Sequence, residues 1–365
     1  MGMKNMKKRY VVIMAGGRGE RFWPQSRLKK PKHLLPIVGK TPMLAQTVDR
    51  LRGLVQPPEV FVITNGEQRD AVLASCPDLL PENVIGEPQG RDTAAAVGLA
   101  ALLIEKTDPG AAFCLLPADH VIADSAGFRR VLSGAFDTAE KKNILVTIGI
   151  RPDFPSTGYG YLRRGDQLDI KGEYAVHFVE RFVEKPNLET ASRYLEEGGY
   201  FWNAGMFVWR PQSILSAIHK YAPELGSGLD LLLNEWTNTK SLQTAMEVVY
   251  PKLKKISIDF AVMEKAENVV MLESDFDWDD VGEWPAIARH YSADQCGNVF
   301  KGNGVALDAS GNLSYANPGH TITLMGVKDL IVVQSEGATL VCHKDCAQEV
   351  KTLAQKVSQK NPELA

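Results

Sequence analysis

The 365-residue sequence lacks several features that would each have set a functional class. No apolar stretch approaches the length of a membrane span, and the apolar run after the basic N-terminus is too short for a signal peptide. The formal net charge is only −3, which argues against a general nucleic-acid-binding surface. No low-complexity linker is present. We therefore expect a cytoplasmic protein with neither a membrane nor a nucleic acid as its partner.

Cysteine is also scarce, with five residues and no C-x-x-C pair. An odd number of cysteines without such a pair is typical of a reducing compartment. Cys342 and His343, together with Cys346, could supply half of a zinc site, but no second pair of ligands lies nearby in the sequence. A structural zinc ion is therefore the less favoured interpretation of this segment.

The composition that remains is that of an ordinary globular protein, with 44% hydrophobic and 23% charged residues. A chain of this length can bury one large core and a smaller one. We expect two domains, a catalytic domain over residues 1–290 and a β-rich domain with a terminal helix over residues 291–365.

The stretch over residues 10–36, YVVIMAGGRGERFWPQSRLKKPKHLLP, is the most informative part of the chain. A short apolar run stops abruptly at Gly16 and Gly17, which predicts a buried strand leading into a tight loop. Glycines allow backbone N–H groups to approach an anion closely, and the arginines and lysines that follow supply positive charge. Residues 16–21 are therefore a candidate cradle for a polyphosphate.

Two known phosphate-binding motifs do not match this stretch. A Rossmann fingerprint needs a third glycine where Phe22 stands, and Pro24 would interrupt a continuing helix. A P-loop ending at Gly39-Lys40-Thr41 would need glycine at position 34, which is leucine. From the residues alone, a glycine turn with solvated arginines remains an alternative.

Apolar runs alternate with amphipathic stretches over the first 150 residues, which predicts an α/β fold with a Rossmann-like, parallel, doubly wound sheet. Ligands of such sheets collect beyond the carboxyl ends of the strands. We therefore expect the Gly16 loop, Glu87-Pro88 and residues 117–120 to converge on one crevice. The strands are expected at residues 11–15, 60–64, 84–85, 112–116 and 144–150, and the helices at 43–54, 67–74, 93–104 and 128–141.

The pattern changes twice in the second half of the chain. Further strands are expected at residues 174–184, 201–209 and 269–272, and further helices at 188–196, 213–221, 229–236, 257–266 and 282–290. After residue 294, short β-rich pieces at 304–307, 313–316, 321–325 and 330–333 are separated by Gly, Asn and Asp turns. This spacing is typical of a small all-β or β-helix-like unit, and an amphipathic helix at 346–357 closes the chain.

The segment GGRGERFWPQSRLKKPK resembles the signature of the sugar-nucleotide pyrophosphorylases, and its Phe-Trp-Pro-x-Ser-Arg form is similar to that of the mannose-1-phosphate guanylyltransferases. Five separated motifs agree in order with this family. The resemblance implies a nucleotidyltransferase domain that transfers GMP from GTP to mannose 1-phosphate, giving GDP-mannose and pyrophosphate with the help of Mg²⁺. Such chemistry needs a triphosphate cradle, cations at the phosphates and carboxylates for the metal.

The resemblance also implies residues for phosphate and metal. Arg21 and Lys32 match the phosphate-facing cations of the family. Asp119 in LPADH matches its Mg²⁺-binding aspartate, and Asp280 in DFDWDDVGEW matches the second one. Asp279 stands where the family often has serine, so the assignment within this acidic run is less secure than the run itself.

The sugar phosphate and the base would be bound by other segments. In the family, the Glu-Lys-Pro of FVEKP supplies a carboxylate to the sugar hydroxyls and a lysine, here Lys185, to the sugar phosphate. The sugar-binding residues implied are Gly160, Glu184, Asn203 and Asp259. GEPQGRDT resembles the family's base-binding segment. With the glycine loop, it gives these nucleotide-binding residues: Ala15, Gly16, Gly17, Arg18, Gly19, Glu87, Pro88, Gly90, Arg91 and Thr93.

Two alternatives remain open at this point. The chain could act on another base or hexose 1-phosphate, or it could be a non-catalytic subunit that binds a sugar nucleotide and regulates an enzyme. The presence of all the matching lysines and aspartates argues against the second. We expect residues 298–341 to be a non-catalytic β unit through which the chain forms a homodimer, because so few apolar strands cannot build an independent core.

Overall fold

The computed structural model describes residues 8–170, 172–274 and 276–364, and the contacts within it divide the chain into two compact units. Unit 1 contains the described chain up to Gly16, Val48–Ala118 and Ile122–Trp278. Unit 2 contains Gly17–Thr47, Asp119–Val121 and the chain from Asp279 onward. Both units are discontinuous in sequence. The boundary between residues 290 and 291 stays a prediction, while the glycine loop belongs to the unit that also holds the C-terminal strands.

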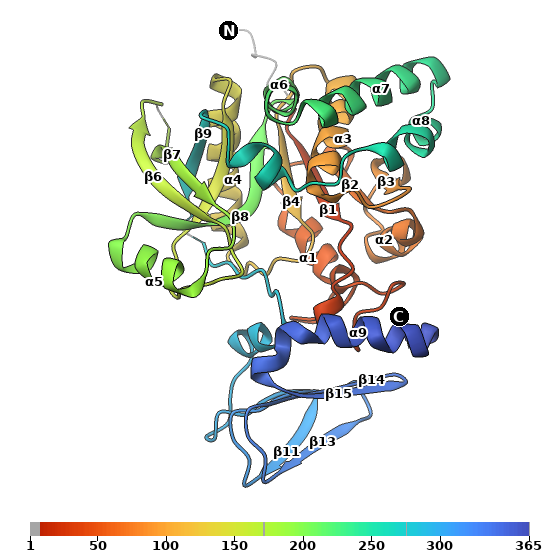
Figure 1. Ribbon diagram of the computed structural model, residues 1–365, viewed down its shortest axis with the longest axis vertical. Helices are drawn as coiled ribbons and strands as arrows, with labels where there is room; N and C mark the ends of the chain where they lie inside the picture. The colour runs from red at the N-terminus through yellow and green to blue at the C-terminus, as the bar shows by residue number, and fades with distance from the viewer. Residues whose placement is uncertain (1–7, 171, 275, 365) are drawn as a thin grey trace. The chain divides into compact units, whose positions relative to one another are not determined.

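Unit 1 is built on a nine-stranded sheet, counted over the described residues, with the order β3-β2-β1-β4-β8-β5-β9-β7-β6 (Figure 1). Most of its strands are buried because their apolar residues face packed layers on both sides, whereas β6 and β7 at one edge are largely half-buried or exposed. The strands are β1 Tyr10–Ala15, β2 Val60–Asn65, β3 Val84–Glu87, β4 Phe113–Pro117, β5 Leu145–Ile150, β6 Tyr161–Leu168, β7 Val176–Val183, β8 Tyr200–Trp209 and β9 Val269–Glu273.

The strands of the first 150 residues have the predicted directions, and the later strands are of mixed direction. The four strands β3, β2, β1 and β4 are mutually parallel, and β5 is parallel to β9. Strand β8 lies between these groups and is antiparallel to both β4 and β5. Because β4 and β5 are both antiparallel to β8, the five strands of the first 150 residues run in one direction, as predicted, whereas β7 and β8 of the later chain run the opposite way. A strand that is buried on both faces has the same apolar pattern in either direction, so the pattern does not encode direction.

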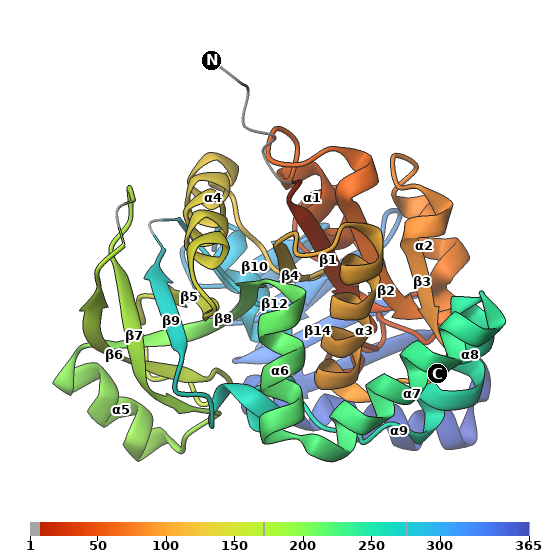
Figure 2. The same ribbon diagram turned by 90° about the horizontal axis from the view of Figure 1, so that it is seen from above.

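Helices cover both faces of this sheet. Figure 2 shows α3 and α6 on one side and α4 on the other. Alanine-rich α3 is buried nearly all round, and a Cβ on its Gly98 would lie 2.4 Å from Leu229 of α7. The helices are α1 Met43–Arg50, α2 Arg69–Ser75, α3 Asp92–Thr107, α4 Ser125–Lys141, α5 Leu188–Glu197, α6 Pro211–Tyr221, α7 Pro223–Thr239 and α8 Leu242–Val249, with a π-helical turn at Asp259–Met263.

Unit 2 has a β-helix-like C-terminal part. Strands β10, β12 and β14 are parallel, as are β11 and β13, and β15 returns antiparallel to β14. The strands are followed by α9, the long blue helix of Figure 1. The bounds are β10 Val299–Lys301, β11 Asn303–Leu307, β12 Leu313–Tyr315, β13 Thr321–Met325, β14 Leu330–Ser335, β15 Ala338–His343 and α9 Val350–Lys360.

Two buried asparagines join successive turns of this part. The side chain of Asn312 donates a 2.8 Å hydrogen bond to Asn298 Oδ1 and accepts one of 2.9 Å from the backbone N–H of Leu330. Neither asparagine is exposed. Such amide pairs satisfy backbone groups at the turns that no strand ladder reaches.

The apolar core of unit 2 unites its three segments. Phe22 and Trp23 of the glycine loop pack with Trp284, Leu313 and Ile331, among others. The α/β class and the β-helix-like C-terminal part predicted from the sequence are confirmed. No helix among the described residues has the length and apolarity that a membrane span requires.

Candidate active site

Gly19 gives the loop after β1 its conformation. Its φ angle of 64° lies in the left-handed region, and a Cβ at this position would lie 2.4 Å from the Cβ of Lys32. The hydroxyl of Ser26 donates a 2.6 Å hydrogen bond to the carbonyl oxygen of Gly19. Glycine is therefore required here by the backbone and by the close approach of Lys32.

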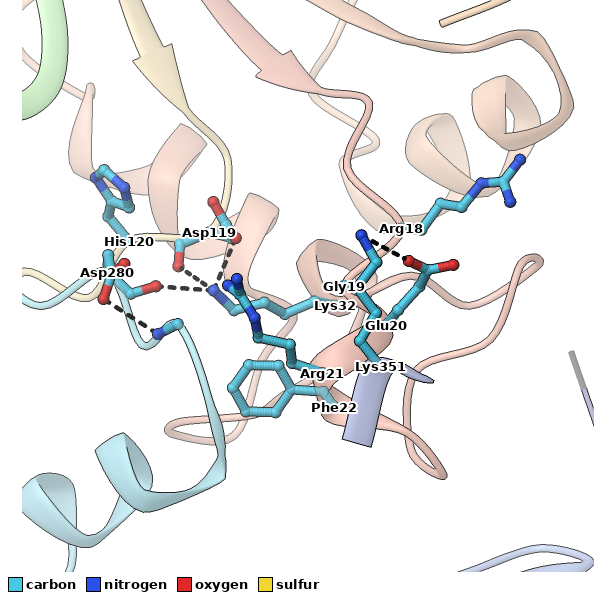
Figure 3. A pocket seen from close by; sticks show the side chains of 11 residues that line it. Arg18, Gly19, Glu20, Arg21, Phe22, Lys32, Asp119, His120, Asp280 and Lys351 are labelled. Atoms are coloured by element: carbon cyan, nitrogen blue, oxygen red, sulfur yellow. Dashed lines mark hydrogen bonds and ion pairs between the residues drawn. The ribbon is translucent and has the colours of Figure 1, made fainter. Parts of the chain in front are cut away.

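This loop borders a pocket of about 520 Å³ in unit 2, which we call the phosphate pocket (Figure 3). Segments far apart in the sequence contribute to its walls. Figure 3 shows Arg21 and Lys32 converging on Asp119, with Asp280 beyond them. The lining residues are Arg18, Gly19, Glu20, Arg21, Phe22, Lys32, Asp119, His120, Asp280, Gly282 and Lys351.

Lys32 is the buried cation of the phosphate pocket, with 5% of its surface exposed. Its Nζ donates hydrogen bonds of 2.7 Å to Asp119 Oδ2 and 2.8 Å to the carbonyl oxygen of Asp280. It also lies 5.3 Å from the centre of the Phe22 ring. Lys32 thus joins its own segment to those of Asp119 and Asp280, the second of which lies 248 residues further along the chain.

Asp119 is ionised and accessible. Burial opposes its charge, but Lys32 and, to a smaller extent, His120 outweigh this effect and lower the pKa of Asp119 to about 2. Its side chain nevertheless keeps 37% of its surface exposed. A carboxylate that is charged at neutral pH and open to the pocket is suited to bind a cation there.

The described aspartates of DFDWDD, residues 275–280, have different surroundings. Asp280 lines the phosphate pocket. Asp279 is buried instead, and accepts hydrogen bonds of 2.6 Å from Arg289 and 2.8 Å from His290, which keep its pKa well below the usual range despite burial. Asp277 accepts hydrogen bonds from the backbone N–H groups of residues 123 and 124. Asp275 lies outside the described residues.

The chemistry of the two pocket carboxylates fits a divalent metal. Asp119 and Asp280 are hard oxygen ligands on one cavity, and Mg²⁺ is commonly bound by one or two carboxylates plus phosphate oxygens and water. No group of three or more His, Cys, Asp or Glu side chains that could hold a metal occurs among residues 8–170, 172–274 and 276–364. The half zinc site at Cys342 is therefore not completed within these residues.

A second cluster, the base cluster, lies in unit 1 around Glu87. Glu87 is 7% exposed and accepts a hydrogen bond from the hydroxyl of Tyr250. Burial raises the pKa of Glu87 to about 7, although the Tyr250 hydroxyl opposes the shift. A Cβ on Gly16 would lie 3.2 Å from Glu87 Oε2, so the first glycine of the loop faces this carboxyl group.

The other residues expected to bind nucleotide differ in their surroundings. Thr93 is engaged structurally, since its hydroxyl accepts a 2.8 Å hydrogen bond from the N–H of Ile258. Ala15 is buried, and its carbonyl oxygen accepts a hydrogen bond from Thr64. Pro88 and Gly90 are exposed, and Arg91 donates a 3.2 Å hydrogen bond to Gln89. Gly17 has open space around the position of a Cβ.

A third cluster, the sugar cluster, brings together the four residues expected to bind the hexose. Asn203 donates a 3.2 Å hydrogen bond to Asp259 Oδ1 and accepts one of 3.1 Å from Thr147. A Cβ on Gly160 would lie 2.6 Å from Glu184 Oε2, so only glycine leaves this carboxylate its place. Lys185 forms an ion pair with Glu184, and its side chain is 59% exposed.

Asp259 is the member of the sugar cluster whose pKa is raised. Burial, and then the charge of Glu184, raise the pKa of Asp259 to about 7. Asp259 lies on the π-helical turn Asp259–Met263, an unusual geometry that often marks functional sites. A carboxyl group with a pKa near neutrality can donate a hydrogen bond when protonated and accept one when ionised, and sugar hydroxyls can take either part.

Sequence reasoning missed Glu20 and Lys351 of the phosphate pocket, Tyr250 of the base cluster and Thr147 of the sugar cluster. Lys351 lies on an amphipathic helix, where an exposed lysine is ordinary, so the sequence held no signal for it. Tyr250 and Thr147 are buried polar residues in apolar surroundings, and only the need of a buried hydroxyl for a partner could have singled them out.

Comparisons with known proteins agree along most of the chain. The family model for nucleotidyl transferases matches residues 10–295, and the model for the mannoseP isomerase/GMP-like beta-helix domain matches residues 302–357. A mannose-1-phosphate guanylyltransferase of Escherichia coli K12 is 38% identical over 354 residues, which cover 96% of this chain and 73% of that protein. The xanthan biosynthesis protein XanB of Xanthomonas campestris is 35% identical, with 95% of this chain and 72% of XanB covered.

A solved structure shares the fold over nearly its full length. The crystal structure described as mannose-1-phosphate geranyltransferase from Thermus thermophilus is 36% identical. It superimposes with a TM-score of 0.84, covering 96% of this chain and 99% of that one.

Proposed function

Because the chain belongs to the mannose-1-phosphate guanylyltransferase family of nucleotidyl transferases, we propose that it transfers GMP from GTP to mannose 1-phosphate, releasing pyrophosphate. The observation that carries this proposal is the phosphate pocket, where the buried Lys32 binds both Asp119 and the backbone of Asp280 beside Arg18 and Arg21. Clustered cations with two accessible carboxylates suit a nucleoside triphosphate and its metal.

In this reaction a phosphate oxygen of mannose 1-phosphate attacks the α-phosphorus of GTP. A new P–O bond forms, the bond from the α-phosphorus to the bridging oxygen breaks, and pyrophosphate leaves with the electron pair. No covalent protein nucleophile is needed, so the chain's task is to align the reactants and neutralise charge. We propose that Arg18, Arg21 and Lys32 neutralise the charge of the β- and γ-phosphates. The backbone N–H groups of Gly16–Gly19 would donate hydrogen bonds to the same phosphates.

Enzymes of this family generally use a divalent metal, and we propose that it is Mg²⁺, held by Asp119 and Asp280. The ion, when bound, neutralises charge on the phosphate oxygens around the reacting phosphorus. Lys32 keeps Asp119 ionised, so the carboxylate is ready to bind without a proton being released.

The sugar cluster provides acceptors and donors for the hexose. We propose that Glu184 accepts from sugar hydroxyls, that Asp259 and Asn203 complete the hydrogen bonds, and that Lys185 binds the sugar phosphate. The exposure of Lys185 supports this role, since a surface lysine beside a carboxylate is free to change partners. Lys185→Ala should therefore impair the use of mannose 1-phosphate more than that of GTP.

Base selection is assigned to Glu87. Guanine presents N1–H and N2–H₂ donors side by side, and a carboxylate can accept from both. Burial of Glu87 supports this role, because a carboxylate in apolar surroundings gains more from such donors than an exposed one does.

Pyrophosphate release across a matrix of GTP, ATP, UTP and dTTP with mannose 1-phosphate or glucose 1-phosphate tests the function. We expect the highest turnover for GTP with mannose 1-phosphate. Selectivity between the two hexoses should be weaker than selectivity between the bases. The hexoses differ in the orientation of one hydroxyl, whose hydrogen bonds contribute ~1–3 kcal/mol. Equal or better turnover of UTP or dTTP with glucose 1-phosphate would assign another substrate pair. Nucleotide binding without turnover in any combination would favour a regulatory subunit.

We also propose that the protein is a cytoplasmic homodimer that pairs through the C-terminal β-rich part. All five cysteines are free, which supports a reducing compartment. Three large apolar side chains stand on β11 and β13 with more than half of their surface exposed, namely Val305, Leu307 and Met325, and such a surface is suited to self-association. Cell fractionation and sedimentation equilibrium test the two parts of this proposal.

A further inference from the structure

The C-terminal helix contributes a cation to the phosphate pocket. Lys351, the second residue of α9, lines the pocket together with Lys32 and Arg21. Its Nζ lies 3.4 Å from Glu20 Oε2, an ion pair that Figure 3 draws as a dashed line. The side chain of Lys351 is 51% exposed and that of Glu20 is 27% exposed. The ammonium group of Lys351 is therefore accessible, and its flexible side chain allows it to change partners.

Packing on the same helix fixes where Lys351 can reach. Val350 and Ala354 are buried in the core that contains Phe22 and Trp23 of the glycine loop. A second contact comes from the turn before α9, where Gln348 donates a 2.5 Å hydrogen bond to Glu283. The base of the Lys351 side chain is thus held by its neighbours, and its ammonium group does not need Glu20 to stay at the pocket.

One negative charge in the phosphate pocket, that of Glu20, is unfavourable for binding a polyphosphate. The lining of the pocket contains three carboxylates, and two of them, Asp119 and Asp280, are the ones proposed above to hold the metal. Glu20 has no such role, and an unneutralised carboxylate beside a triphosphate is repulsive. Lys351 pairs with this third carboxylate, Glu20.

We propose that Lys351 is a polyphosphate-binding residue that leaves Glu20 for the β- and γ-phosphates of GTP, or for pyrophosphate in the reverse reaction. This inference rests on the proposed function. A phosphate group offers the lysine more negative charge and more acceptor oxygens than one partly exposed glutamate does, and exposed ion pairs are individually weak. Exchange of partners is therefore favourable when the polyphosphate enters.

A purely structural ion pair makes a different prediction. If Lys351 and Glu20 only attached α9 to the glycine loop, removing either partner would loosen the pocket and weaken polyphosphate binding in the same direction. If Lys351 binds phosphate and Glu20 competes for it, removing the lysine weakens binding while removing the glutamate strengthens it. The two variants together therefore distinguish the roles.

Calorimetric titration with inorganic pyrophosphate and Mg²⁺ measures this without catalysis. We expect Lys351→Gln to weaken pyrophosphate binding about tenfold, the usual effect of one charge-assisted hydrogen bond, and Glu20→Gln to tighten it about threefold. Lys351→Arg should restore much of the affinity. Lys356→Gln, at an exposed position on α9 that does not line the pocket, is the matched control and should bind as the wild type does.

Steady-state kinetics give the second readout. Lys351→Gln should raise the KM for GTP by a similar factor while the KM for mannose 1-phosphate changes less than twofold, because only the polyphosphate loses a contact. Weakened pyrophosphate binding in both Glu20→Gln and Lys351→Gln, or wild-type binding in Lys351→Gln, would overturn the inference. A wild-type chain that makes no GDP-mannose yet binds pyrophosphate through Lys351 would instead contradict the proposed function alone.

Discussion

At the scale of single residues, Gly19 is the position where one methyl group should matter most. In Gly19→Ala the new Cβ would meet Lys32 at 2.4 Å in a left-handed backbone conformation. We expect the free energy of unfolding to fall by about 2 kcal/mol, the sum of the backbone cost and the displaced lysine. Thermal or urea unfolding measures this change.

Gly17→Ala is the control for that substitution, since no atom beyond its chain neighbours lies within 4 Å of its Cβ position. Its stability should equal that of the wild type to within ~0.5 kcal/mol. Equal free energies of unfolding for the two alanine variants would show that the close approach of Lys32 does not make glycine necessary at position 19.

Glu87 should make nucleotide binding depend on pH. Its raised pKa of about 7, caused mainly by burial, leaves it mostly protonated at pH 6 and mostly ionised at pH 8. If the ionised form accepts hydrogen bonds from guanine, GTP affinity should rise by about tenfold between these values. Calorimetry across this range measures the slope.

Glu87→Gln is the reference for this measurement, because the phosphates of GTP titrate identically with both proteins. The variant should lose the contribution of Glu87 and show a shallower pH profile. Parallel profiles for wild type and variant would remove Glu87 from base recognition.

The residues of the phosphate pocket could be predicted because strand ends, glycines and a family motif all pointed to Lys32, Asp119 and Asp280. What could not be predicted was the division of work within the acidic run. Asp277, Asp279 and Asp280 have the same chemistry, and only the fold decides which one meets Arg289, which one binds backbone N–H groups and which one faces the pocket.

At the scale of elements, the buried asparagine pair should hold the β-helix-like part together. Asn312→Ala removes hydrogen bonds to Asn298 and Val327 and leaves the N–H of Leu330 without its acceptor. We expect a loss of about 3 kcal/mol in the free energy of unfolding, because buried polar groups lose their partners. Urea unfolding is the measurement.

Asn303→Ala is the matched control, since this asparagine is exposed on β11. It should change stability by less than ~0.5 kcal/mol. Equal losses in the two variants would show that burial of the amide pair contributes nothing specific.

Many elements follow from apolar periodicity, but β6, β10, β15 and α8 do not, and residues 282–290, expected as a helix, contain a 3₁₀ helix at Trp284–His290. Strand β6 was missed because its pattern includes Arg163, Arg164 and Gly165, charged or flexible residues on an exposed surface. Strand β15 was missed because half of its side chains are exposed, which weakens its apolar pattern. It forms an antiparallel hairpin with β14. Helix α9 begins at residue 350 rather than 346, since Lys344–Glu349 forms a 3₁₀ helix first.

At the scale of the whole molecule, self-association should depend on the exposed apolar surface of β11 and β13. Met325, 73% exposed, pairs in register with Leu307 on the neighbouring strand. Met325→Glu would place a charge in an apolar interface, so the variant should be largely monomeric at concentrations where the wild type is a dimer. Sedimentation equilibrium measures the masses.

Val248→Glu, which changes an exposed valine of α8 in unit 1, is the control and should keep the mass of the wild type. A wild-type monomer at micromolar concentrations, or a Met325→Glu dimer of unchanged affinity, would argue against association through this surface.

The division into two units was not accessible to sequence reasoning, which places domain boundaries where composition changes. Gly17–Thr47 and Asp119–Val121 pack with the chain after Asp279 although they lie far from it in sequence. Such packing depends on tertiary contacts of side chains such as Phe22 and Trp284, whose ring centres lie 5.1 Å apart.

The assignment of nucleotidyl transfer to the phosphate pocket is tested most directly by turnover against Mg²⁺ concentration in Asp119→Asn, Asp280→Asn and Asp277→Asn. The first two should each lose ~10²–10³ in kcat, the usual effect of removing one well-placed electrostatic group, and should need more Mg²⁺ for half-maximal turnover. Asp277→Asn, outside the pocket, should resemble the wild type. Wild-type turnover in Asp280→Asn with an inactive Asp277→Asn, or turnover of the wild type that does not depend on Mg²⁺, would contradict the assignment.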